Sequence, residues 1–250
     1  MKPENISIII PTHNRVCKLE RLLQSIDKQK IPPLEVIIIN DGSKDNTKEF
    51  LNNWQQEKRR FFPIVYNNPI SGGPATARNI GIQLASAEAI AFTDDDCILQ
   101  SSWIRTILES KVWEVEDIIV GIGGRVLPYS RGIVSEYYSF HHILEPPPYI
   151  QYLVTANACY LKKTLIEVSG FDETYGHPGG EDNDLSFKLS SKGYKFGFEK
   201  KMIIWHDYRT SISSFIKTFY RYGKGCGVVS QKVLNIKPKT KMEGKYYDFF

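Results

Sequence analysis

The stretch AIAFTDDD, residues 89–96, joins four apolar residues through a single threonine to three adjacent carboxylates, Asp94, Asp95 and Asp96. A short apolar run of this kind is typical of a strand buried on both faces of a parallel sheet. Adjacent carboxylates repel one another, and their burial is costly unless a cation is close. A hard divalent ion with oxygen ligands, Mg²⁺ or Mn²⁺, would relieve that repulsion. A solvated acidic turn before a helix at Ser101 is the alternative interpretation.

Three similar apolar runs precede this strand, at residues 6–10, 36–39 and 64–66, and Pro11 is expected to end the first of them. Each run is followed by a helical pattern, over about 16–26, 46–57 and 72–85. Asn46, with Glu49 three residues later, predicts a capped start for the second helix. The alternation of strands and helices predicts right-handed crossovers and a mainly parallel sheet with helices on both faces.

Polar clusters follow three of these strands, at residues 12–15, 40–43 and 94–96. Ligands of such sheets bind beyond the carboxyl ends of the strands, so we expect the clusters to converge on one crevice. Asp41 can accept a hydrogen bond from a base or a ribose there, or it simply belongs to an Asp-Gly turn. The amides of Gly72 and Gly73 either approach a phosphate or only begin a helix.

Four further side chains are candidates for chemistry. Arg78 either reaches a diphosphate or pairs with Asp94. Glu181 and Asp182 follow the glycine-rich stretch 176–180 at a helix start, so one of them serves as a general base or both cap the helix. His206 follows the apolar residues 202–205, and either a structural role or a ligand role suits it.

The second half of the chain is less regular. Strands are predicted near 118–127 and 158–161, short helices at 164–169 and 181–192, an extended stretch at 194–205, and a longer helix over 211–232. Residues 128–150, which are rich in proline and aromatic residues, are expected to form a loop-rich excursion. Residues 237–250 are basic and then aromatic, which favours contact with an anionic membrane or a partner subunit, or a frayed solvated end.

The composition bounds the class of protein. The chain has 250 residues, 42% hydrophobic and 24% charged, with a net charge of +4. Such values are typical of a globular protein and give no reason to expect a nucleic-acid partner. No apolar segment is long enough to span a membrane, and the first apolar run is too short for a signal peptide. Four cysteines without a CxxC pair favour a reducing cytoplasm, with peripheral contact at the inner membrane face as a further expectation.

Seven sequence pieces together carry a family resemblance: SIIIPTHNR (7–15), VIIINDGSKDNT (36–47), GGPATARNIGI (72–82), AFTDDDC (91–97), TANACYLKKTLIEVSGFDE (155–173), GGEDNDLSFKLSSKGYK (179–195) and IIWHD (203–207). In their order and spacing, over about residues 5–210, the chain resembles the family 2 inverting glycosyltransferases of the GT-A fold. The resemblance implies an α/β fold of GT-A type, with a mainly parallel Rossmann-like sheet flanked by helices and a smaller mixed region on the acceptor side. It also implies a catalytic domain over 1–210, divided into a nucleotide-binding half (about 1–100) and an acceptor-binding half (about 101–210), with a helix and tail over 211–250.

What the resemblance implies for function is a nucleotide-sugar donor, UDP-linked, and a site that depends on Mn²⁺ or Mg²⁺. Transfer would proceed with inversion to a hydroxyl of a glycan, a lipid-linked or a protein-linked acceptor. Asp182 would be the catalytic base, with Glu181 as the next candidate. The metal would be held by Asp96, Asp94 and His206. The remaining donor contacts would come from Pro11, Thr12, Arg15, Asp41, Arg78, Asp94 and Asp95, with Asp41 on the uracil.

The sequence lacks two features of the larger membrane-bound members of this family. A Gln-x-x-Arg-Trp signature and membrane-spanning helices are absent from the sequence, and FYRYGKGCG (219–227) is the nearest piece. This argues against a processive polymer synthase, although a role in polysaccharide biosynthesis fits. A nucleotidyltransferase would carry a glycine-rich phosphate loop after the first strand, where this chain has PTHNR (11–15). A non-catalytic sugar-nucleotide sensor would be favoured by the loss of an acid at 96 or 182, and both are present.

Overall fold

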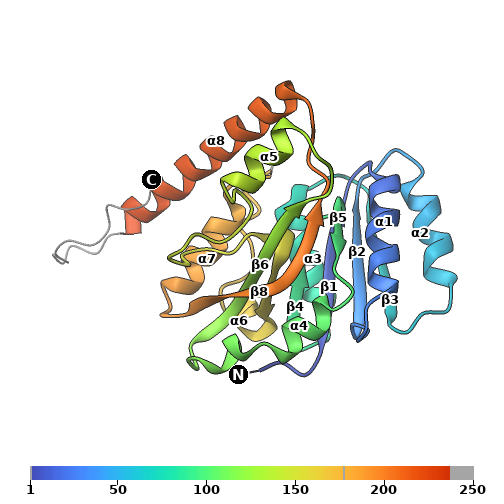
Figure 1. The fold of residues 1–250 in the computed structure, drawn as a ribbon, viewed down its shortest axis with the longest axis horizontal. Helices are drawn as coiled ribbons and strands as arrows, with labels where there is room; N and C mark the ends of the chain where they lie inside the picture. Colours follow the sequence, from blue (N-terminus) through green and yellow to red (C-terminus); the bar gives the residue numbers. More distant parts are fainter. Residues whose placement is uncertain (1, 177, 237–250) are drawn as a thin grey trace.

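A computed structural model describes residues 2–176 and 178–236 of the chain. Their eight strands form one sheet in the order β3-β2-β1-β4-β7-β6-β8-β5 (Figure 1). The strands are β1 (Ile6–Thr12), β2 (Glu35–Asp41), β3 (Phe62–Asn68), β4 (Ala89–Phe92), β5 (Cys97–Leu99), β6 (Ile119–Pro128), β7 (Ala158–Leu161) and β8 (Lys195–His206).

The helices of the described residues connect and cover these strands (Figure 1). They are α1 (Val16–Asp27), α2 (Thr47–Gln56), α3 (Gly73–Leu84), α4 (Trp103–Glu109), α5 (Ile133–Phe140), α6 (Lys162–Glu167), α7 (Glu181–Ser190) and α8 (Ile212–Ile236). Short 3₁₀ turns lie at Lys111–Glu114 and Thr155–Asn157. The second turn directly precedes β7 and supplies a contact in the candidate site.

The sheet has a parallel part and a mixed part. β1 pairs in parallel with β2 and β4, and β2 with β3. Beyond β4, the pairings with β7 and then β6 are antiparallel, β6–β8 is parallel, and β8–β5 is antiparallel. The α/β architecture with a mixed second region is therefore confirmed, and the strand ends after β1, β2 and β4 lie along one edge.

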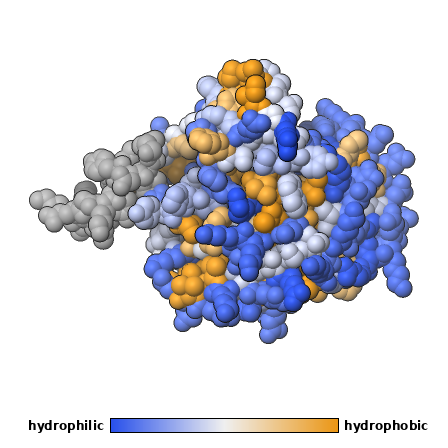
Figure 2. Space-filling view, viewed as in Figure 1, coloured by the Kyte–Doolittle hydropathy of each residue, from blue (hydrophilic) through white to orange (hydrophobic). Residues whose placement is uncertain are grey.

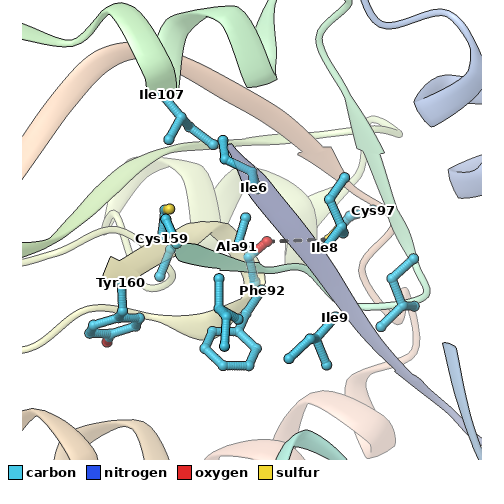
Figure 3. Packing of buried hydrophobic residues seen from close by; sticks show 14 of the residues in the cluster. Ile6, Ile8, Ile9, Ala91, Phe92, Cys97, Ile107, Cys159 and Tyr160 are labelled. Atoms are coloured by element: carbon cyan, nitrogen blue, oxygen red, sulfur yellow. Dashed lines mark hydrogen bonds between the residues drawn. The ribbon is translucent and has the colours of Figure 1, made fainter. Parts of the chain in front are cut away.

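Strands β1, β2 and β4 form the centre of the hydrophobic core. Ile8 and Ile9 of β1 lie beside Ala91 and Phe92 of β4, in register, and all four are fully buried (Figure 3). The first of these strands has strand neighbours on both edges and helices on both faces, which explains its continuous apolar sequence. Burial of each large side chain contributes roughly 1.5–3 kcal/mol, which gives the adjoining acidic triplet a rigid support.

Two local expectations were wrong, and two short elements were not predicted. Pro11 continues β1, because β4 pairs only with Ile6–Ile9 and a proline is tolerated where a strand has one neighbour. The side chain of Asn46 makes no capping bond, and the carboxylate of Asp45 accepts from the amide and hydroxyl of Thr47 instead. The excursion 128–150 contains helix α5, and the stretch after the acidic triplet contains the short strand β5.

Candidate functional site

One pocket of about 670 Å³ lies at the carboxyl ends of the parallel strands. The sequence clusters that were expected to converge all contribute to its wall: Pro11, Thr12, Arg15, Asp41, Asp94, Asp95 and Asp96. The start of α3, the end of β8 and helix α8 complete it. The expectation of a single crevice is therefore confirmed.

Two of the three acids of the triplet share one arginine. Nη1 of Arg15 donates to Asp95 Oδ1 and to Asp96 Oδ2, each at 2.8 Å. The second oxygen of Asp95 accepts from the hydroxyl of Thr12 at 2.8 Å. Burial, followed by the neighbouring charge of Asp96, raises the pKa of Asp95 to about 6 against the opposing effect of Arg15. Asp95 is therefore fully engaged by Arg15 and Thr12, and it forms a rigid part of the pocket wall.

Asp96 and His206 form the pair best suited to hold a metal ion. Nε2 of His206 lies 3.3 Å from Asp96 Oδ1, and these two atoms group with the sulfur of Cys97 within 4.8 Å of one another. Nδ1 of His206 has no hydrogen-bond partner among the described residues, and the ring stacks on Tyr208 with centroids 4.6 Å apart. Burial holds the pKa of the Cys97 thiol well above its usual range, and the residue belongs to the hydrophobic core.

This donor set fits a divalent ion of the Mn²⁺ class. A carboxylate oxygen and an imidazole nitrogen are ligands that suit Mn²⁺, whereas a neutral buried thiol is a poor one. Asp96 and His206 therefore fit the expected metal. Asp94, the third expected ligand, lines the same pocket, and its Oδ1 accepts from Nη2 of Arg78 at 2.9 Å.

Arg78 connects the acidic triplet with the acids of α7. Its guanidinium donates to Asp94 Oδ1 and, through Nη1 at 3.2 Å, to Glu181 Oε1. Burial alone would lower the pKa of Arg78, but the carboxylates of Asp94, Asp182 and Glu181 raise it above its usual value. Glu181 uses its other oxygen to accept from the amide of Gly179 at 2.6 Å. Both oxygens of Glu181 are thus engaged in holding Arg78 and the preceding loop.

Asp182 is held by the turn before β7. Its oxygens accept from the amide of Thr155 at 3.1 Å and from the hydroxyl at 2.9 Å. Glu181, Asp182 and Asp184 lie in the first turn of α7, where the helix dipole favours acidic side chains, so the helix-start alternative stays open. Burial and the charge of Glu181 raise the pKa of Asp182 to about 7, against the opposing effects of Arg78 and Thr155. Glu181 and Asp182 do not form part of the pocket wall as described above.

Asp41 lies at the pocket with its carboxylate fully engaged. Four donors from the end of β3 and the residues after it surround the carboxylate: the side chains of Asn68 and Ser71 and the amides of Gly72 and Gly73, at 2.7–2.9 Å. Both glycine amides are therefore directed at this carboxylate. Through these four bonds Asp41 holds residues 68–73 against the end of β2.

Helix α8 supplies a part of the pocket that sequence reasoning missed. Five of its residues line the wall: Ser214, Phe215, Thr218, Arg221 and Tyr222. Nη2 of Arg221 donates to the hydroxyl of Thr218 at 3.1 Å, and its buried Nε has no partner among the described residues. The available signal was the aromatic and basic segment 219–227 of the sequence.

Glycines allow the backbone of α8 to contact the backbone of the loop before α7. A Cβ on Gly225 would lie 2.1 Å from the carbonyl oxygen of Gly179, and one on Gly180 would lie 2.7 Å from Gly225 Cα. Gly180 also adopts a φ of +94°, which favours glycine. Any side chain at these positions would separate the two segments, so the backbone contact is a condition for a closed pocket wall.

Comparison with solved structures identifies the fold class. A mannosyltransferase from Pyrobaculum calidifontis, solved with GDP-Man and Mn²⁺, superimposes with a TM-score of 0.73 at 18% identity, over 95% of this chain and 66% of that chain. The fold is that of the GT-A glycosyltransferases. The model of the family described as glycosyl transferase family 2 matches residues 7–167, and the chain belongs to this family.

Curated relatives cover different shares of the chain. The pre-mycofactocin glycosyltransferase of Mycobacterium tuberculosis is 26% identical over 231 residues, 86% of this chain and 46% of the relative. The GalNAc(5)-diNAcBac-PP-undecaprenol beta-1,3-glucosyltransferase of Campylobacter jejuni is 36% identical over 104 residues, 42% of this chain and 33% of the relative. The chain thus spans less than half the length of these relatives.

Two earlier expectations concern membranes. Within residues 2–176 and 178–236, the helices are too short or too polar for any of them to cross a bilayer. The basic and aromatic tail at 237–250 lies outside the described residues.

Proposed function

We propose that this chain transfers a sugar, with inversion, from a UDP-linked donor to an acceptor hydroxyl, with a divalent metal ion at the donor and Asp182 as the general base. The observation that carries the proposal is the bridge made by Arg78. The buried guanidinium of Arg78 contacts Asp94 of the triplet and Glu181 of α7. The two acidic groups are therefore neighbours that share one positive charge. Membership of glycosyl transferase family 2 supports the reaction class.

The donor half of the site is assigned to about residues 1–100, with His206 added from β8. Asp96 and His206 would hold the metal ion, which would supply charge stabilisation to the departing diphosphate. Arg15 keeps Asp96 oriented through its bond to Oδ2, which leaves Oδ1 directed at His206. Pro11 and Thr12 line the same wall, and Asp94 would contact the donor beside Arg78.

The acceptor half is assigned to about residues 101–210, with α8 closing it. In the reaction, the acceptor oxygen forms a bond to the anomeric carbon while the bond from that carbon to the diphosphate oxygen breaks. The hydroxyl proton passes to a carboxylate oxygen of Asp182, and the electron pair of the broken bond leaves with the diphosphate. A carboxyl group with a pKa of about 7 suits this task, because general bases work best near the ambient pH.

Asp41 is assigned to the uracil of the donor. Its carboxylate stands at the end of β2, and its present donors belong to one short segment that a base could displace. The solved structure named above was obtained with GDP-Man, so the choice of nucleotide needs a direct test. The acceptor is assigned only to the class of glycans and lipid-linked or protein-linked sugars, and a role in polysaccharide biosynthesis is part of the proposal.

The experiment is release of UDP from a set of UDP-sugars, with Mn²⁺ or with EDTA, in the presence and absence of candidate acceptors. We expect release that requires the metal and increases with the correct acceptor. Tight binding of a UDP-sugar without any release, with every acceptor class tried, would favour the non-catalytic sensor. Release of pyrophosphate from a nucleoside triphosphate would favour the nucleotidyltransferase.

A further inference from the structure

The helices α5 and α8 expose apolar side chains that the candidate site does not use. On α5, Ile133 is 83% and Phe140 80% exposed, and on α8, Ile212 is 67%, Ile216 60% and Tyr220 69% exposed. Exposure of so many large apolar side chains on two short stretches is unusual for a free surface. We call these five residues the apolar ridge.

The two halves of the ridge are adjacent. The positions of Ile212, Ile216 and Tyr220, four residues apart, place them along one side of α8. Tyr137 lies one turn from Ile133 on α5, and its ring contacts Phe215 and Phe219 of α8, with centroids 5.2 and 5.8 Å apart. Figure 1 shows α5 and α8 side by side, and Figure 2 shows apolar surface that projects from the end of the molecule where α8 begins.

Basic side chains border the α8 part of the ridge, and the exposed Glu136 lies between Ile133 and Phe140 on α5. Lys217 and Lys224 lie three residues before and four residues after Tyr220, so they flank the apolar stripe of α8. Arg131 and Arg209, both exposed, precede α5 and α8. The sequence 212–236 contains Lys217, Arg221, Lys224 and Lys232 and has no acidic residue.

We propose that the apolar ridge docks on an anionic lipid surface, with α8 lying in the interface. The apolar side chains of such a helix can insert among the acyl chains of a lipid layer. The lysines beside them can then contact the anionic headgroups. A protein partner would instead require an apolar counterpart with acidic edges. Ser214, Thr218 and Arg221 of the same helix line the pocket, so docking would bring the pocket wall to the lipid surface.

The test is co-sedimentation of the whole chain with vesicles of phosphatidylcholine alone or mixed with phosphatidylglycerol, without any sugar nucleotide. We expect binding to the mixed vesicles that weakens with salt. Ile212→Gln with Ile216→Gln should weaken binding by about tenfold or more, since two large apolar side chains no longer insert. Lys217→Gln with Lys224→Gln should weaken binding to the mixed vesicles by about fivefold per lysine.

Val115→Gln with Ile166→Gln is the matched control, because these side chains are 68% and 58% exposed and lie outside the ridge. This variant should bind as the parent does. Equal vesicle binding by the parent and by the Ile212/Ile216 variant would overturn the proposal. The proposal would also fail if only deletion of residues 237–250 abolished vesicle binding. A concentration-dependent dimer that the Ile212/Ile216 changes abolish, without vesicle binding by the parent, would assign the ridge to a second copy of the chain. Because no donor or acceptor is present, the result is independent of the proposed transferase activity.

Discussion

Thr155 engages both carboxylate oxygens of Asp182, one through its backbone amide and one through its hydroxyl. An asparagine at 182 can keep this arrangement, since its oxygen accepts from the amide and its nitrogen donates to the hydroxyl. The substitution Asp182→Asn therefore removes the negative charge and the ability to accept a proton while it keeps the side chain in place. This makes the general-base assignment testable without disrupting the turn at Thr155–Asn157.

Asp182→Asn should leave the affinity for UDP nearly unchanged and lower the transfer rate by roughly 10²–10⁴-fold, the usual cost of losing a general base. Calorimetry with UDP and a UDP-release assay measure the two quantities. Glu181→Gln is the companion variant, because it weakens the contact with Arg78 and should affect donor binding more than the rate. A folded Asp182→Asn protein with near-native turnover would exclude Asp182 as the base.

The rate should also depend on pH. Because the pKa of Asp182 is raised to about 7, this side chain is protonated below that pH and unable to accept a proton. The value of kcat/KM should rise as the pH increases through about 7 and then level off. The Asp182→Asn variant should lack this limb of the profile. A limb that persists in the variant belongs to another group.

Stability should change in the opposite direction over the same range. Asp182 binds its proton more tightly in the folded chain, with a pKa of about 7, than in the unfolded chain, where the pKa is 3.8. Its contribution to the free energy of unfolding is therefore largest below about pH 4 and is lost as the pH rises towards 7. Metal-free melting curves should show a smaller decline over this interval for Asp182→Asn than for the parent. Parallel declines would contradict the assigned pKa.

UDP binding should require the metal pair. EDTA, Asp96→Asn and His206→Ala should each weaken UDP binding by about tenfold or more, since a charge-assisted contact with the diphosphate is lost. Asp117→Asn, at an exposed acid outside the pocket, is the control. Isothermal calorimetry with and without Mn²⁺ measures the effect, and unchanged affinity under all three conditions would remove the metal from the donor site.

The nucleotide preference should depend on Asp41. We expect UDP to bind more tightly than GDP or ADP, and Asp41→Ala to narrow that difference. Ser71→Ala removes one of the four bonds that Asp41 accepts while the carboxylate stays, so this control should keep the preference. Equal affinity of the native protein for the three nucleotides would exclude the uracil assignment.

Strands β1, β2 and β4 were predictable because they are buried on both faces and carry continuous apolar runs, and the more exposed edge strand β3 still has a short apolar run at 64–66. Strand β5 and helix α5 were not predicted. The strand has only three residues, and the helix lies within a segment rich in proline and aromatic residues, so neither has a long apolar pattern of its own. Short elements depend on tertiary partners such as the Tyr138–Phe215 ring contact between α5 and α8.

The site was predictable at the level of residues and less so at the level of contacts. The sequence motifs named the acids, but the orientation of Asp95 towards Thr12 and the four bonds to Asp41 arise from segments that meet only in the folded chain. The contribution of Arg221 was missed because it lies about 125 residues beyond the acidic triplet, on a helix with few local signals of a binding role.

The contact between Gly180 and Gly225 also determines the order in which the protein can assemble its pocket. Residues 6–206 contain every strand of the described sheet, so the sheet can form before α8 emerges from the ribosome. The wall at Thr218 and Arg221 closes only when the chain around Gly225 has been made and reaches the loop at Gly179. Newly made chains would therefore pass through a stage with a folded sheet and an open pocket, and protease cleavage during synthesis would fall on α8 first.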